Sequence, residues 1–264
     1  MITGAGRGIG KRLAIGFAAE GARLGLMART QAELDATKYE IEQTPSQGVL
    51  SVPGDVRDAD QMQHVAETVA ATLGSIDVLI ACAAIQGPVG PFLDSHPHHW
   101  FETFDTNLLG LMNACRAVLP GMIARRSGKV IAMIGDGVSC GRPNFALYAA
   151  ANAATARFVE TVADEIREKN VQINCMNPGA TYTSMTDEVL RAGERAGSRE
   201  LEACKQLRIT GGLPADRQMR TAMFLASERS NHVSGKVISV HDDLKRLSDE
   251  NMRADSYTLR RLKI

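Results

Sequence analysis

The stretch that decides the fold begins Gly128-Lys-Val-Ile-Ala-Met-Ile134, continues through a loop rich in Gly, Ser and Pro, and then reads Tyr148-Ala-Ala-Ala-Asn152. Residues 130–134 form a short apolar run bounded by turn formers, which predicts a buried strand. Residues 149–168 are rich in Ala and carry apolar residues at helical spacing, which predicts a helix. Tyr148 and Asn152 would then share one helix face. The stretch therefore predicts a strand, a loop, and a helix with a phenol in its first turn.

A glycine-rich loop near the start of the chain is the second informative feature. Thr3-Gly-Ala-Gly-Arg-Gly-Ile-Gly10 precedes a helical pattern. Glycines let a backbone turn sharply and approach a pyrophosphate, and the free amides at a helix start attract its charge. The spacing Gly4-x-x-x-Gly8-x-Gly10 differs from the common dinucleotide fingerprint. Taken alone, the loop is also compatible with a structural glycine turn.

Together the two stretches resemble the short-chain dehydrogenase/reductase family, whose glycine loop has the form TGxxxGxG and whose catalytic pair is a tyrosine followed four residues later by a lysine. The resemblance runs from Thr3 to about Val240. It implies a Rossmann-type α/β fold: a doubly wound parallel sheet with helices on both faces and the cofactor at the carboxyl ends of the strands. We expect a single domain over residues 1–264, with a substrate-covering helical flap at 184–213 and a C-terminal tail at 244–264.

The residues after the second predicted strand, 23–28, bear on the choice of cofactor. An acidic residue there would bind the ribose 2′-hydroxyl of NAD, whereas an arginine accommodates the 2′-phosphate of NADP. Here Arg29 and Thr30 follow Ala28, and Arg7 lies in the glycine loop. This pair of cations resembles the NADP-preferring branch of the family, because guanidinium matches phosphate in charge and geometry. The alternative is two solvated arginines, but both flank the same expected pocket, so we predict NADP(H).

The resemblance also assigns residues to the other parts of the cofactor. It places Asp55 against the adenine amino group with Val56 beside the ring, and it places a Pro-Gly segment after the strand at 171–176 against the nicotinamide. The family's Asn-Asn-Ala-Gly motif falls on 81–84, where only Ala83 matches and Cys82 replaces an asparagine. A nucleophilic Cys82 would require an activating base, so we favour a packing role for it. The predicted cofactor set is Gly4, Gly6, Arg7, Gly8, Ile9, Gly10, Arg29, Thr30, Asp55, Val56, Ala83, Pro178, Gly179, Thr181 and Thr183.

The catalytic centre that the resemblance implies is incomplete. Related enzymes use a serine to hold the substrate carbonyl, a tyrosine as acid or base, and a lysine to bind the ribose and lower the tyrosine's pKa. Tyr148 is present, and Asn107 resembles the family's asparagine that bends a helix and holds a water for proton relay. Asn152 stands at the lysine position, where it would contact the ribose without a charge. The serine position falls within residues 134–136, none of which carries a hydroxyl.

The energetic consequence of the lost lysine is large. A free phenol has a pKa near 10, so effective proton transfer near neutrality requires a shift of about three units, or roughly 4 kcal/mol. A neutral amide does not supply that shift, and we predict redox turnover that is slow, shifted in its pH optimum, or absent. The alternative for Tyr148 is an ordinary core tyrosine at a helix start.

Composition narrows the possible partners. Acidic and basic residues number 30 each, so we expect a small-molecule substrate and neither nucleic acid nor an anionic membrane. Five scattered cysteines, no apparent membrane-spanning run and no signal peptide predict a cytoplasmic protein. His96-Pro-His-His-Trp100 suggests a metal site, but no carboxylate or cysteine set completes it and Pro97 indicates a helix start, so no metal is predicted. Relatives pair through the helices near 100–125 and 148–168, which implies a homodimer or homotetramer.

Two functions stay open. The first is an NADP(H)-dependent carbonyl reductase or alcohol dehydrogenase acting on a small metabolite with atypical or weakened catalysis. The second is a protein of the same fold that binds a nucleotide or metabolite without hydride transfer. Retained cofactor positions favour the first, and the loss of the serine, lysine and asparagine positions favours the second.

Overall fold

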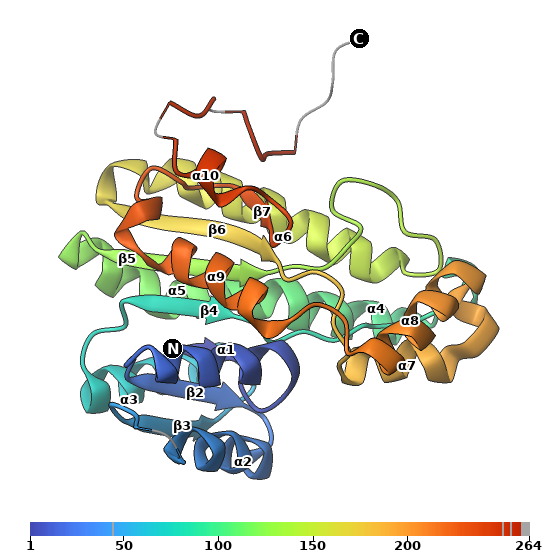
Figure 1. The fold of residues 1–264 in the computed structure, drawn as a ribbon, viewed down its shortest axis with the longest axis horizontal. Helices are drawn as coiled ribbons and strands as arrows, with labels where there is room; N and C mark the ends of the chain where they lie inside the picture. Colours follow the sequence, from blue (N-terminus) through green and yellow to red (C-terminus); the bar gives the residue numbers. More distant parts are fainter. Residues whose placement is uncertain (44, 250, 254, 260–264) are drawn as a thin grey trace.

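The fold is built around one parallel sheet. The computed structural model describes residues 1–43, 45–249, 251–253 and 255–259. Over these residues the sheet has seven strands in the order β3-β2-β1-β4-β5-β6-β7, all pairs parallel (Figure 1). The strands are β1 Ile2–Thr3, β2 Leu24–Ala28, β3 Val49–Pro53, β4 Val78–Ala81, β5 Gly128–Met133, β6 Val171–Asn177 and β7 Val237–Ser239. The strand order reverses between β1 and β4, so the predicted doubly wound sheet is confirmed and its switch point is fixed.

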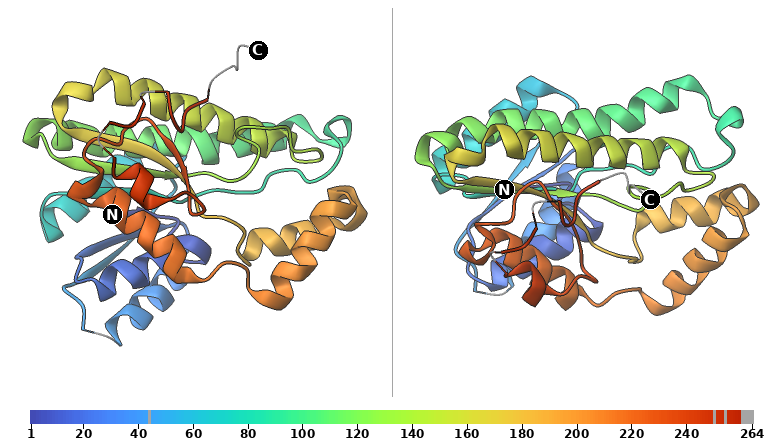
Figure 2. Two further views of the ribbon diagram at one scale, coloured as in Figure 1. Left: turned by 45° about the horizontal axis from the view of Figure 1, so that its top comes forward. Right: turned by 90° about the horizontal axis from the view of Figure 1, so that it is seen from above.

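Helices cover both faces of the sheet (Figure 2). On one face α3 (Ala59–Leu73), α5 (Gly110–Arg125) and α6 (Ala146–Glu165) contribute to one buried apolar cluster with β4, β5 and β6. On the other face α1 (Gly8–Ala19), α2 (Gln31–Glu42) and α9 (Ala215–Ala226) contribute to a second. The strands are apolar on both sides because both sides are covered. This arrangement leaves the carboxyl ends of the strands free to form a site.

The segment before β5 is one long helical run. It consists of α4 (Pro97–Phe104), a π-helical turn (Asp105–Leu109) and α5, and α4 begins at the proline as the sequence predicted. The side chain of His96 caps α4 by accepting a hydrogen bond from the backbone amide of His98. The run is long and apolar enough to cross a membrane by length and composition, although the sequence analysis expected no such segment. Length and composition alone are weak evidence for a membrane span, since the inner face of this run packs into the core beside the sheet.

The predicted flap is a helical pair that projects beyond the sheet, seen in orange at the right of Figure 1. It consists of α7 (Ser184–Ala192), a 3-10 turn (Gly193–Ala196) and α8 (Ser198–Thr210). The tail, with the short α10 (Leu244–Leu247), returns to the sheet: the Tyr257 carbonyl accepts a hydrogen bond from the Val237 amide, and the Leu259 carbonyl accepts one from Arg157. Tyr257 and Leu259 therefore contact their own chain, while residues 260–264 of the predicted tail lie outside the described residues.

Candidate active site

The glycine loop joins β1 to α1 and is shaped by close backbone contacts. Gly4 has a φ of +65°, and a Cβ on it would lie 2.8 Å from the Ala83 backbone. A Cβ on Gly10 would overlap the Gly4 carbonyl. The Thr37 hydroxyl on α2 bonds the Ala5 and Gly6 carbonyls at 3.1 and 3.2 Å, which fixes the outer side of the loop. Close backbone contacts therefore require glycine at positions 4 and 10.

The loop ends at a helix start that is open to an anion. Arg7 is the residue before α1, and its side chain makes no capping hydrogen bond to the amides of the first turn. Unpaired amides at a helix N-terminus bind phosphate groups. Thr3 ties this region to the next strand, since its hydroxyl accepts hydrogen bonds from the amides of Cys82 and Ala83 at 3.1 and 3.3 Å. The local structure therefore fits a pyrophosphate next to the end of β4.

The two predicted arginines and one acidic residue lie around the end of β2. Arg7 and Arg29 both line the cleft above the loop, together with Thr30. Glu33 lines it too and forms an ion pair with Arg7 at 3.5 Å. The sequence analysis did not single out Glu33, because its place in the first turn of α2 had no counterpart in the motifs used. Glu33 therefore partly neutralises the positive charge of Arg7. Arg29 directly follows the end of β2.

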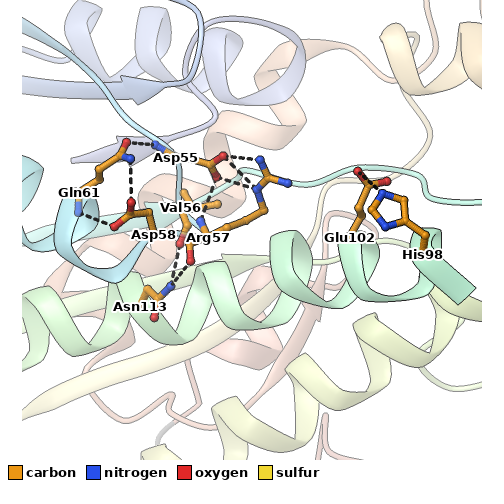
Figure 3. Close-up of polar contacts among 8 residues, drawn as sticks. All are labelled: Asp55, Val56, Arg57, Asp58, Gln61, His98, Glu102 and Asn113. Carbon is orange, nitrogen blue, oxygen red and sulfur yellow. Dashed lines mark hydrogen bonds and ion pairs between the residues drawn. The ribbon is translucent and has the colours of Figure 1, made fainter.

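Hydrogen bonds hold the polar segment that follows β3 in place (Figure 3). Asp55 is held by Arg57, whose Nη2 lies 2.6 Å from Oδ2, and the hydrogen bond from the Arg57 side chain lowers the pKa of the Asp55 carboxyl. The Asn113 side chain of α5 donates to the Val56 carbonyl at 2.9 Å. The carboxylate that the sequence assigned to adenine therefore already has a strong partner. It still lines the cleft beside Val56.

The loop after β6 forms the opposite wall of the cleft. Gly179 has a φ of +70°, and the buried Gln218 on α9 donates to both the Pro178 carbonyl and the Thr181 hydroxyl, at 3.1 and 2.7 Å. Thr183 forms a reciprocal capping box with Thr186 at the start of α7. The buried Gln218 therefore holds this loop in place. The sequence patterns alone did not identify this residue.

One cleft of about 510 Å³ joins all of these parts. Every residue of the predicted cofactor set lines it, and so does Tyr148. A cavity of that size at the switch point of a parallel sheet is typical of a nucleotide site. Asn107 and Asn152 line a separate small cavity of about 20 Å³ behind Tyr148, which has room for one water molecule.

Tyr148 points toward the end of β5 from the first turn of α6. Its side chain is buried, and a Cβ on Gly135 would overlap its hydroxyl. Gly135 is one of the three residues predicted to occupy the serine position, so the phenol fills space into which a side chain there would extend. Burial raises the pKa of Tyr148, while its hydrogen bond to Asn152 acts in the opposite direction.

Asn152 and Asn107 hold backbone around the phenol. Asn152 Oδ1 accepts from the Gly135 amide at 3.3 Å and its Nδ2 donates to the Asp136 carbonyl at 3.4 Å. Asn107 lies in the π-helical turn, and its side chain makes two hydrogen bonds with the Ile85 backbone at 2.8 and 2.9 Å. Both amides are engaged with backbone on the inner side of Tyr148, which fits positioning better than direct contact with a substrate.

Comparison with known proteins identifies the family. A family model described as short chain dehydrogenase matches residues 1–193. The chain is 31% identical to the 3-oxoacyl-(acyl-carrier-protein) reductase FabG of Thermotoga maritima, over 92% of this chain and 96% of that protein. This chain belongs to the short-chain dehydrogenase/reductase family.

Solved structures of family members agree with this assignment. A levodione reductase is similar with a TM-score of 0.82 and 26% identity, covering 90% of this chain and 93% of its own. A gluconate 5-dehydrogenase from Burkholderia cenocepacia, described as a complex with NADP and tartrate, is similar with a TM-score of 0.77 and 28% identity, covering 90% and 91%. As a member of this oxidoreductase family, the chain has a fold whose cleft serves a nicotinamide dinucleotide.

One cation, Arg142, lies beside Tyr148. Arg142 comes from the loop between β5 and α6, and its guanidinium lies 4.0 Å from the Phe145 ring centre and 5.7 Å from that of Tyr148. It binds both carboxylate oxygens of Glu200 on the flap, at 3.2 and 2.8 Å. Arg142 was not singled out from the sequence, although an arginine in the loop just before Tyr148 was a usable signal.

Cys82 behaves as a packing residue. Cys82 is half-buried just after β4 and lines the cleft, and burial raises the pKa of its thiol to about 12. The reactive form of a cysteine is the thiolate, which such a group does not form near neutrality. This supports the interpretation that Cys82 fills space where relatives carry an asparagine.

Proposed function

We propose that the protein is an NADP(H)-dependent oxidoreductase of the carbonyl reductase or alcohol dehydrogenase class, acting on a small molecule with weakened catalysis. The observation that carries the proposal is the single cleft that contains the whole predicted cofactor set together with Tyr148. The similarity to FabG and to a gluconate 5-dehydrogenase described with NADP supports it further.

The preference for NADP(H) rests on charge. Arg29 follows β2 directly and Arg7 opens α1, and both line the cleft where a 2′-phosphate would lie. No acid occupies the strand end itself, where relatives that use NAD would bind the ribose hydroxyls. Glu33 pairs with Arg7, so we assign the larger share of phosphate binding to Arg29.

The chemistry assigned to the site is a balanced two-electron reduction. Bound NADPH would supply the hydride for the substrate's carbonyl carbon and become NADP⁺, and the Tyr148 hydroxyl would supply the proton for the carbonyl oxygen. The Asn152 side-chain amide donates a hydrogen bond to the Tyr148 oxygen, and Asn152 Oδ1 accepts from the Gly135 amide, which fixes the phenol beside Gly135. Asn107 lines the small cavity through which Tyr148 would be reprotonated, and its hydrogen bonds with the Ile85 backbone fix its side chain there.

The weakness follows from the electrostatics around the phenol. The family's lysine would lower the tyrosine's pKa, whereas here burial raises it and only a neutral amide occupies that position. A phenol with a raised pKa is a poorer proton donor during reduction and a poorer source of phenolate during alcohol oxidation. We therefore expect low turnover in both directions at neutral pH.

A non-redox binding role is the second candidate, favoured by the replaced serine and lysine positions. In either case we propose a homo-oligomer, because Phe101, Leu109 and Met112 leave apolar surface exposed on the α4–α5 run. We also propose a cytoplasmic location, which the five free cysteines favour.

The test is titration of the purified protein with NADPH and NADH, followed by absorbance at the reduced nicotinamide band with a panel of ketones. We expect tighter binding of NADPH than of NADH and slow NADPH oxidation. Binding without oxidation would favour the non-redox role, and absence of binding would refute the cofactor assignment.

A further inference from the structure

The substrate side of the cleft contains an arginine placed to bind an anion. Arg142 lines the cleft with Tyr148, and its side chain is only 16% exposed. Its guanidinium carbon lies over the Phe145 ring, an arrangement that leaves the N–H groups of the edge to form hydrogen bonds. An arginine held in this way is organised to bind a carboxylate through two parallel hydrogen bonds.

The structure already contains such a carboxylate, and it belongs to the flap. Glu200 on α8 binds Nε and Nη2 of Arg142 in the two-point geometry, and its side chain is 29% exposed. Glu200 also lines the cleft. The pair thus connects the loop that carries the catalytic end of α6 to the helix that covers the substrate. An incoming ligand carboxylate would make the same two bonds.

The flap has few other attachments near this point. A small apolar cluster of Phe145, Tyr148, Val189, Ala196 and Cys204 joins it to the active site, separate from the two main clusters of the sheet. Cys204 is the buried residue of α8, and the rest of that helix is largely polar or partly exposed. Glu200 can therefore leave Arg142 for solvent without disrupting a main core.

A second polar group in the cleft lacks a partner. Gln86, just beyond β4, is 4% exposed and lines the same cleft, and its buried Nε2 has no hydrogen-bond partner. The segment after it packs beside the Arg142 loop, since the Gly90 amide donates to the Asn144 carbonyl. A buried donor without an acceptor is costly, and an oxygen-rich ligand would satisfy it. Arg199 adds a further cation to the lining.

We propose that the substrate of this site carries a carboxylate, which binds Arg142 in exchange for the side chain of Glu200, with Gln86 as an additional donor. The inference rests on the proposed function for its reacting carbonyl, and it names the substrate class as short oxo acids or hydroxy acids. Glu200 then acts as a competing internal ligand that occupies the arginine when no substrate is present.

The test is calorimetric binding of oxo acids and their methyl esters, with and without NADP⁺. Pyruvate, acetoacetate and levulinate vary the distance from carbonyl to carboxylate, and each ester removes the charge. We expect Arg142→Gln to weaken oxo-acid binding about tenfold or more, Arg142→Lys to weaken it less, and Glu200→Gln to strengthen it severalfold. Ester binding should change less than about twofold in these variants. Glu202→Gln is the matched control, because Glu202 is on the same helix but outside the cleft lining.

Oxo acids and esters that respond alike, an unchanged oxo-acid affinity in Glu200→Gln, or absence of oxo-acid binding to both wild type and Glu200→Gln would overturn the inference. An NADPH titration on the same samples separates it from the proposed function. Oxo-acid binding with the expected pattern but no NADPH binding would leave the carboxylate site standing and remove the reductase.

Discussion

The cofactor side and the proposed catalytic side of the cleft depend on different kinds of contact. On the cofactor side the determinants are largely backbone geometry, as at Gly4, where any side chain would meet the Ala83 backbone. On the proposed catalytic side they are side-chain contacts: Asn152, at the position where the family resemblance implies a lysine, bonds the Gly135 amide and the Asp136 carbonyl. A neutral side chain can therefore hold the local backbone at that position, whereas a glycine in close contact with backbone cannot be changed so easily.

The largest expected effect comes from removing the one catalytic group that is kept. Tyr148→Phe keeps the ring in its apolar cluster and removes only the hydroxyl. We expect NADPH-dependent turnover to fall by about 10² to 10⁴, the usual contribution of general acid catalysis, with NADPH affinity unchanged. Steady-state kinetics and a fluorescence titration measure the two quantities. Tyr39→Phe, at an exposed tyrosine, is the control. Turnover that survives in Tyr148→Phe would mean that the catalytic side works through another residue.

The next effect tests the backbone argument on the cofactor side. Gly4→Ala would place a Cβ 2.8 Å from Ala83 at a φ of +65°, a conformation that costs about 1–3 kcal/mol for a residue other than glycine. We expect NADPH binding to weaken about tenfold or more, together with a lower Tm. Gly141→Ala is the control, since no atom lies within 4 Å of its added Cβ. Equal NADPH affinity in both variants would show that the loop does not require its glycine.

A smaller effect concerns pH. Alcohol oxidation requires the phenolate, and burial raises the pKa of Tyr148, so the wild-type rate should rise about tenfold per pH unit through neutrality without a plateau. Asn152→Lys adds the missing charge, lowers that pKa and should move the plateau to lower pH by about one to three units. Asn152→Met, which is uncharged, is the matched control. Identical pH profiles in the lysine and methionine variants would show that the missing charge is not the cause of the weak catalysis.

The smallest effect concerns cofactor choice. Arg29 is exposed, so its contribution to the 2′-phosphate is screened by solvent. We expect Arg29→Ala to raise the Kd for NADPH about fivefold and to leave that for NADH unchanged. Arg116→Ala, at an exposed arginine of α5 away from the cleft, is the control. An equal loss of affinity for NADPH and NADH in Arg29→Ala would mean that Arg29 contacts a part of the cofactor that both share.

Sequence was sufficient for the fold because its markers are local and ordered along the chain. The glycine loop, the strand ending at Met133 and the helix carrying Tyr148 each follow from short-range patterns. The two contacts that distinguish this site, Arg142 with Glu200 and Gly135 with Tyr148, join residues whose approach depends on how the flap and the loop pack. No periodicity or motif encodes such pairs, so they required the three-dimensional structure.

The most direct test asks whether the chemical step limits turnover, as expected for a complete cofactor site combined with weak proton donation by Tyr148. A preformed complex with NADPH, or with NADPH deuterated at the transferred hydrogen, is mixed rapidly with a ketone substrate while the absorbance is followed. The account predicts no burst before the steady state and a primary isotope effect on kcat, because proton donation by Tyr148 is poor and hydride transfer is slow. A rapid burst without an isotope effect on kcat would contradict it, since product release would then limit a fully competent centre.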